Sequence, residues 1–140
     1  MRRSCRARDE AGTALPAVIG LMMIGLLLVG LVFELARWGS LWRETAFVAE
    51  AAAEAGAATI DLATLRSGTV ALSPDLAIAA AVTAGNEARP RPNRVITAAV
   101  PAPDIVCVDV SQEYSSALLN LFGATSVQVS ATACASPARG

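Results

Sequence analysis

The sequence has no histidine and no lysine, so all eleven of its basic residues are arginines. Without an imidazole, histidine acid–base catalysis and histidine metal ligation are excluded. The three cysteines, Cys5, Cys107 and Cys134, do not form the C-x-x-C spacing of metal and redox sites. A net charge of −1 without a long basic run gives nucleic-acid binding no electrostatic support. We therefore expect no cofactor, no bound metal and no nucleic-acid partner.

Catalytic motifs are also missing. The sequence has no glycine-rich phosphate loop after a strand, no G-x-S-x-G and no Cys–His combination. Asp104, Asp109 and Glu113 have the chemistry for a carboxylate pair or an oxygen-ligand site. Charges exposed at strand ends are the simpler interpretation of these three residues. The sequence predicts a protein that is not an enzyme, has no catalytic residue and takes no small-molecule substrate.

Residues 11–33 form an uncharged, strongly apolar run of 23 residues. A hydrocarbon core about 30 Å thick requires roughly 20 such residues in a helix, so we expect a transmembrane helix over 11–33. A buried core helix would need a larger surrounding domain than this chain of 140 residues provides. A removable signal peptide would have a shorter apolar region and an A-x-A-like cleavage site, which residues 33–37 do not offer.

Charge on either side of this run predicts its orientation. Residues 1–10 form a basic head in which Arg2, Arg3, Arg6 and Arg8 outnumber Asp9 and Glu10. The arginine excess keeps that side in the cytoplasm. We expect a single-pass protein of the cytoplasmic (inner) membrane, with its C-terminal domain outside. Trp38 and Trp42 follow the run one helical turn apart and are predicted interface anchors against the lipid bilayer.

An alanine-rich helix is expected over 34–66, where it would form a stalk beyond the bilayer. Its charged side carries Arg43, Glu50, Glu54 and Asp61. The opposite side consists of Phe47, Val48, Ala51, Ala52, Ala55 and Ala58. One interpretation is a solvated amphipathic helix; the other is that the alanine side docks a partner helix, because small side chains let two backbones approach closely.

Residues 67–140 predict a small extracytoplasmic α+β domain. Ser73 and Pro74 mark a helix start, and this second helix should end at Gly85 and Asn86. Strands are expected over 94–100, 105–110 and 126–134, with a short helix over 112–122. The fold class is therefore α+β and membrane-anchored: a long N-terminal transmembrane and stalk helix, then about three strands with one or two helices. The connector 89–94 is interpreted as solvated, or as a contact to acidic lipid or a partner.

Cys107 and Cys134 have matching parity, since each lies on the more polar face of its predicted strand. If those strands are neighbours, a disulfide can form, and an oxidising environment outside the cytoplasm would preserve it. Two buried free thiols are the alternative. We favour the disulfide.

The arrangement of these features resembles the TadE/TadG-like proteins of the tight-adherence (Flp) pilus assembly system. The resemblance lies in the arginine-rich head with Gly12, the apolar run, Glu34-Leu35-Ala36-Arg37, the alanine-rich 43–57 and the closing strand pattern of 126–133. It implies a membrane-anchored pseudopilin-like subunit that takes part in pilus assembly, surface adherence or secretion. Its partners would be other pilus-assembly membrane proteins or pseudopilins, contacted through the alanine-rich helix. The alternative function is a secreted or membrane-tethered binding domain.

Some members of that family are cut by a prepilin peptidase after a glycine, which the resemblance places between Gly12 and Thr13. Cleaved members carry a glutamate at the fifth mature position, where this chain has Ala17. We therefore expect the uncleaved membrane form.

Overall fold

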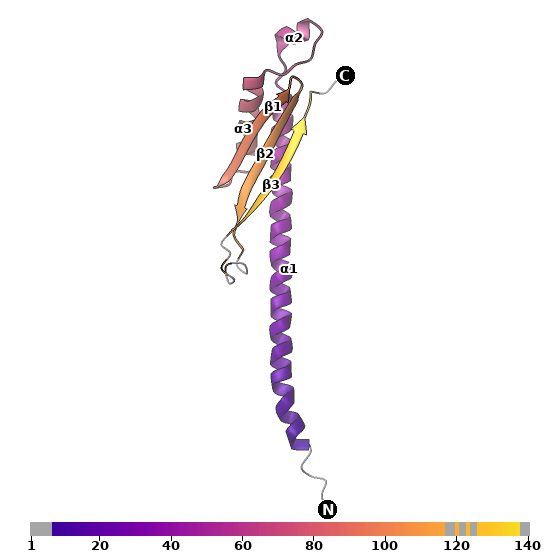
Figure 1. Cartoon of the computed structure of the whole chain (residues 1–140), viewed down its shortest axis with the longest axis vertical. Helices are drawn as coiled ribbons and strands as arrows, with labels where there is room; N and C mark the ends of the chain where they lie inside the picture. The colour runs from indigo at the N-terminus through magenta and orange to yellow at the C-terminus, as the bar shows by residue number, and fades with distance from the viewer. Residues whose placement is uncertain (1–6, 117–119, 121–122, 124–125, 138–140) are drawn as a thin grey trace, which may run out of the picture. The chain divides into compact units, whose positions relative to one another are not determined.

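The computed structural model describes residues 7–116, 120, 123 and 126–137, and their side chains from Leu15 onward. The chain divides into two compact units, Met1–Arg37 and Trp38–Gly140. Helix α1 (Ala7–Ala57) supplies residues to both of them. The remaining elements are helices α2 (Leu62–Arg66) and α3 (Pro74–Ala88) and three strands (Figure 1).

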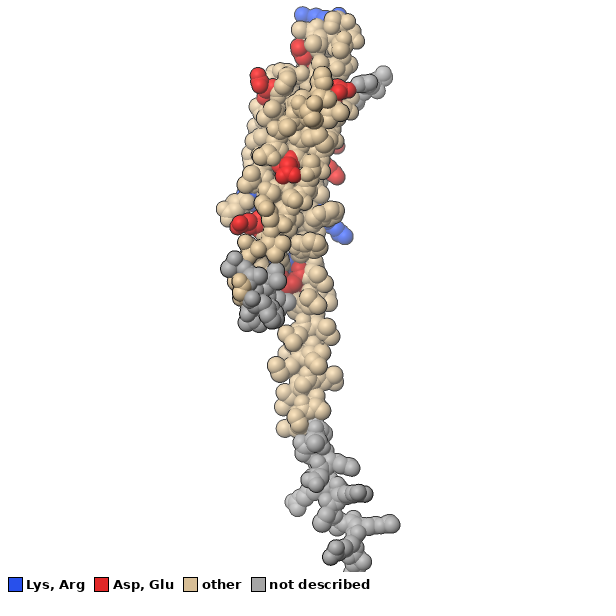
Figure 2. All heavy atoms as spheres, in the orientation of Figure 1, with Lys and Arg blue, Asp and Glu red and all other residues tan. Residues whose placement is uncertain are grey.

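The described part of the first unit is an apolar stretch of helix. Within the described residues, α1 contains one stretch, Leu15–Ala57, that is long and apolar enough to cross a membrane, and an 18-residue window of it has a mean hydropathy of 2.6. Its large hydrophobic side chains up to Phe33 are between 49% and 73% exposed. Residues 15–33 contain no charged residue, and the stretch of helix next to the grey N-terminal atoms is tan throughout in Figure 2. The prediction of a long apolar N-terminal helix is confirmed, a feature that membrane spans and signal sequences share.

The second unit contains an antiparallel sheet of three strands, in the order β1-β2-β3. The strands are β1 (Arg94–Ala102), β2 (Ile105–Tyr114) and β3 (Val127–Ala135). Pro103 and Asp104 form the turn between β1 and β2, where proline fixes the backbone for a reversal. Burial alternates along the strands, as the period-two pattern predicts: the inner face is buried in β2 and mostly half-buried in β1 and β3. The predicted α+β class with three strands is confirmed.

The core lies between the inner face of the sheet and two helices. Val106, Val108 and Val110 of β2 are fully buried against Val48 and several alanines of α1 and α3: Ala49, Ala52, Ala53, Ala57, Ala77 and Ala81. These small side chains bring the backbones close together, and glycines occupy the tightest contacts. A Cβ added at Gly56 would lie 3.0 Å from the Ala77 carbonyl oxygen, and one at Gly85 would lie 2.9 Å from Ile96 Cδ1.

Two expectations about α1 are wrong. The alanine-rich helix does not continue unbroken to 66, because α1 ends at Ala57. Ile60 forms an isolated bridge with Leu72, and Asp61 accepts a hydrogen bond from the Ala63 N–H as the N-cap of α2. Phe47 does not lie opposite the charged residues: it is exposed, as Arg43 and Glu50 are, whereas Val48 and Ala52 of the predicted alanine side are buried in the core of the same unit.

Two further helix predictions need correction. The second helix passes through Gly85 to Ala88, because Gly85 packs closely against Ile96 and Ala52. Ser73 is its N-cap, but the Ser73 side chain makes no capping hydrogen bond. The helix predicted over 112–122 does not begin at Gln112, because β2 continues to Tyr114. Most of its remainder, including Leu118, lies outside the described residues.

Replacing Gly56 by Ala is expected to lower the unfolding free energy by about 1–2 kcal/mol. The new methyl group would meet the backbone oxygen of Ala77, which cannot rotate away as a flexible side chain would. The matched control is Gly39→Ala on the same helix, where nothing lies within 4 Å of an added Cβ. That control should be neutral or stabilising by up to about 1 kcal/mol, since alanine favours helix. Thermal melts of both full-length variants in detergent would show equal effects if the close contact at Gly56 were unimportant.

Candidate functional site

A polar cluster closes one end of the core of the second unit. Arg94 begins β1 and has the parity of the core residue Ile96, so its side chain points toward the helices. Gln112 is the Cα partner of Arg94 on β2 and is buried. Glu44 of α1 completes the cluster, with its side chain 9% exposed.

The Glu44 carboxylate receives hydrogen bonds from two arginines. Arg91 donates from Nε to Oε1 at 2.8 Å and from Nη2 to Oε2 at 2.7 Å, which is a bidentate pair. Arg94 donates from Nη2 to the same Oε1 at 2.8 Å. Arg94 also donates to Gln112 Oε1 and to the backbone carbonyl of Arg89. This network ties α1 to the connector between α3 and β1.

The charges of the cluster shift the acidity of Glu44. Burial raises the pKa of this carboxyl, but the hydrogen bonds and positive charges of Arg94 and Arg91 together lower the pKa below its usual value of 4.5. The Arg94 side chain is only 2% exposed, whereas that of Arg91 is 46% exposed. Glu44 is therefore ionised at neutral pH and balances a charge that is almost entirely removed from water.

A hollow of about 370 Å³ adjoins the cluster on the connector. It is lined by Asn86, Arg89, Pro90, Arg91, Pro92 and Arg94. The interpretation of this connector as merely solvated is incomplete, because Arg91 and Arg94 are both engaged by Glu44.

The predicted interface anchors and cleavage residues all lie on α1. Trp38 and Trp42 belong to the second unit and are about half exposed. Gly12 and Thr13 lie within the helical backbone of α1, outside the described side chains.

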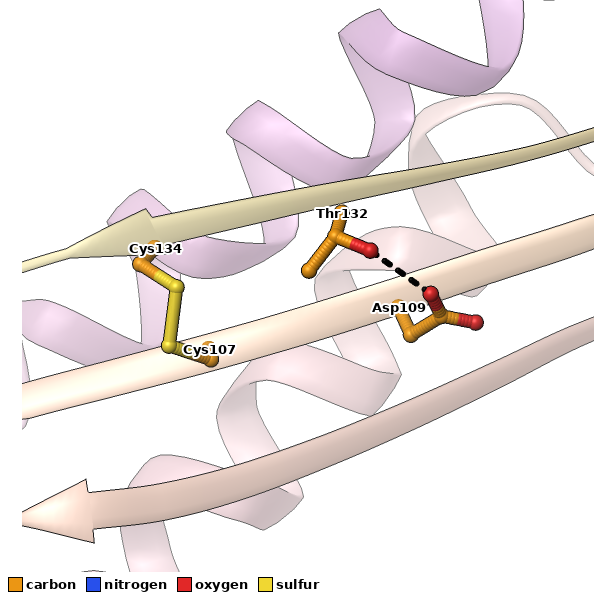
Figure 3. The surroundings of a disulfide bond; sticks show 4 residues. All are labelled: Cys107, Asp109, Thr132 and Cys134. Atoms are coloured by element: carbon orange, nitrogen blue, oxygen red, sulfur yellow. Dashed lines mark hydrogen bonds between the residues drawn. A yellow bond between two sulfur atoms is a disulfide. The ribbon is translucent and has the colours of Figure 1, made fainter.

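The outer face of the sheet carries a disulfide between Cys107 and Cys134 (Figure 3). The two residues are direct cross-strand partners of β2 and β3, with 4.0 Å between their Cα atoms. On the same face, Thr132 Oγ1 donates a hydrogen bond of 2.7 Å to Asp109 Oδ2.

The three acidic residues singled out in the sequence form no recognisable metal site. Asp109 and Glu113 are exposed on the outer face of β2, and Asp109 lies in the middle of the strand rather than at its end. Within the described residues, no group of three or more Cys, Asp or Glu side chains is arranged to hold a metal ion. Nor does any buried side-chain polar atom there lack a hydrogen-bond partner.

Sequence reasoning missed the Glu44 cluster, although a signal was present. Glu44 follows Leu41 by three residues and precedes Val48 by four, so it shares their side of a helix. A carboxylate at such a position requires a positive partner. Identifying Arg94 as that partner also requires the strand pairing, which places Arg94 opposite Gln112 on the inner face.

No protein-family model matches the sequence, and no curated protein or solved structure shows significant similarity to the chain.

Proposed function

We propose that this chain is a membrane-anchored structural subunit, similar to the pseudopilin-like TadE/TadG proteins of the tight-adherence pilus system. Its part would be in pilus assembly, adherence or secretion rather than catalysis. The arginine-rich head would remain in the cytoplasm, α1 would cross the inner membrane, and the second unit would lie outside. The resemblance of the sequence to that family supplies the pilus part of this proposal.

The main support for a membrane anchor is the apolar surface of α1 between Leu15 and Phe33, which is exposed on every side. A helix that is apolar all round requires apolar surroundings, and a bilayer core provides them over this length. The disulfide supports the location of the second unit, because disulfides persist outside the reducing cytoplasm.

A partner that binds α1 in the second unit would have to use the uncovered side of the helix. That side carries Arg43, Phe47, Glu50 and Glu54, all of them exposed. The core of the unit covers Val48 and Ala52 of the side expected to mediate such contacts. We therefore assign any pseudopilin contact of this unit to the charged and aromatic side of α1.

Membrane extraction tests the anchor. The full-length protein is expected to stay in the membrane fraction through high salt and alkaline carbonate. Arginines placed at Leu21 and Ile24 should release a large share of it, because each costs about 2.5–3.5 kcal/mol near the centre of a span. The control places arginines at Leu62 and Leu65 of α2, which are exposed apolar residues outside the proposed span, and should leave extraction unchanged. Release of the unmodified protein by salt alone would refute the anchor.

Two measurements separate this proposal from its alternatives. A reporter active only outside the cytoplasm, fused after Gly140, should be active; an expressed but inactive fusion would reverse the orientation. Mass spectrometry of the mature N-terminus should find it intact. Cleavage beyond Phe33 would instead support a secreted binding domain.

Genes for a pilus ATPase and an inner-membrane platform next to this one would favour the assembly role, and their absence would count against it.

A further inference from the structure

We propose that the hollow on the connector between α3 and β1 binds the phosphate of an anionic lipid headgroup. The hollow is lined by three arginines, Arg89, Arg91 and Arg94, with two prolines between them. Choosing a lipid as the source of the phosphate rests on the proposed membrane anchor. The inference that the hollow binds a phosphate group rests only on the connector and the residues around it.

The charge balance of the hollow favours an anion. Arg91 and Arg94 share the single carboxylate of Glu44. Two positive charges against one carboxylate leave this ion-pair network with an excess of positive charge, and Arg91 carries it at a half-exposed position. Both oxygens of Glu44 are already occupied by arginine N–H groups, so this carboxylate is not free to bind a cation.

The connector is built to present its guanidinium groups in fixed positions. Pro90 and Pro92 restrict the backbone φ and remove two N–H groups. Arg94 donates to the carbonyl of Arg89, which holds the start of the connector against the sheet. Arg91 uses Nε and Nη2 for Glu44, and its side chain is half exposed beside the hollow. A planar guanidinium held in this way suits the oxygens of a phosphate, which it can contact through two hydrogen bonds.

The position of the cluster on α1 favours a lipid over a soluble ligand. Glu44, which forms an ion pair with Arg91, lies two residues after Trp42. Exposed tryptophans on a membrane helix settle at the headgroup level. A belt formed by Trp38 and Trp42 therefore brings the connector to the depth at which lipid phosphates lie. Nucleic acid, the other common phosphate ligand, is disfavoured by the net charge of −1 of the chain.

The test is lipid selectivity of the full-length protein in nanodiscs that contain equal amounts of phosphatidylglycerol and phosphatidylcholine. Native mass spectrometry of the released protein should show retained phosphatidylglycerol in excess. Arg89→Gln and Arg91→Gln should each reduce that excess, on the order of fivefold per arginine. Arg66→Gln removes the same charge from an exposed position in α2 and is the matched control. It should leave the selectivity unchanged.

Each result of this experiment either supports or overturns the proposed binding of a lipid phosphate. Equal retention of the two lipids, or an equal loss of selectivity in Arg66→Gln, overturns the inference. Displacement of the bound lipid by millimolar inorganic phosphate would assign the hollow to a soluble phosphate compound and overturn the headgroup source. Arg89→Gln keeps the inference testable if loss of the Arg91–Glu44 pair disturbs the fold. Failure of the protein to insert into nanodiscs would contradict the proposed membrane anchor instead, so the two failures are distinguishable.

Discussion

Removing the Cys107–Cys134 disulfide by the double substitution C107S/C134S is expected to lower the unfolding free energy by about 3–4 kcal/mol. The bond closes a loop with a sequence separation of 27 residues, and in the chain-entropy model a loop of this size is worth that amount. For a unit of about 100 residues, this corresponds to a decrease in Tm of roughly 15–25 °C. Thermal unfolding of the full chain in detergent, followed by near-UV circular dichroism, measures the effect.

Two controls isolate the contribution of this bond. Thr132→Val removes the neighbouring hydrogen bond to Asp109 on the same exposed face and should cost no more than about 1 kcal/mol. Cys5→Ser should change nothing in the second unit. Without a reductant, the denatured wild-type protein should react with a thiol reagent at Cys5 alone. Labelling of Cys107 and Cys134 under those conditions, or a double variant as stable as the wild type, would contradict the prediction.

The substitution Glu44→Gln should destabilise the second unit by about 2–4 kcal/mol, because it leaves the buried guanidinium of Arg94 without a carboxylate. The effect is expected to lie toward the lower part of the range for a broken buried pair, since Arg91 is half exposed and stays hydrated. Glutamine keeps the shape of the side chain, so the loss reports on charge rather than on packing. Urea unfolding in detergent, with tryptophan fluorescence as the signal, measures it.

The pH dependence provides a second readout of the same interaction. The pKa of Glu44 is lowered in the folded state, so its contribution is complete above the ordinary pKa of 4.5. This contribution is lost as the pH falls below 4.5 through the lower folded value. The stability difference between wild type and Glu44→Gln should therefore shrink in that acidic range. Glu50→Gln, at an exposed position of the same helix, should stay within about 0.5 kcal/mol of wild type, and a larger change would implicate general charge effects.

The sheet was predictable from the sequence because its signal is local. Alternation in β2 and β3 identifies both strands and gives Cys107 and Cys134 the same face. The end of α1 was not predictable in this way. The helix stops where Ile60 pairs with Leu72 and where Thr59 accepts a hydrogen bond from the Ser73 N–H. These partners are brought together only by the tertiary fold.

The site shows the same division between local and tertiary information. A run of small residues on α1 indicates close packing, but the pattern does not say whether the packing partner belongs to the same chain. In the structure, that partner is α3 with Ala77 and Ala81, together with the sheet. The position of Glu44 between Leu41 and Val48 carries a local signal, whereas its pairing with Arg91 and Arg94 depends on contacts 47 and 50 residues along the chain. Sequence periodicity does not encode such distances.

The core of the second unit joins its first element to its last. Val48 and Ala52 of α1 share this core with Ala131 and Ala133 of β3, which lie at the other end of the unit in sequence. A chain that is synthesised from its N-terminus therefore leaves this core incomplete until β3 has been made. Closure of so long a loop is slow compared with local helix formation. Synthesis of β3 thus sets the earliest moment at which the complete core of this unit can form.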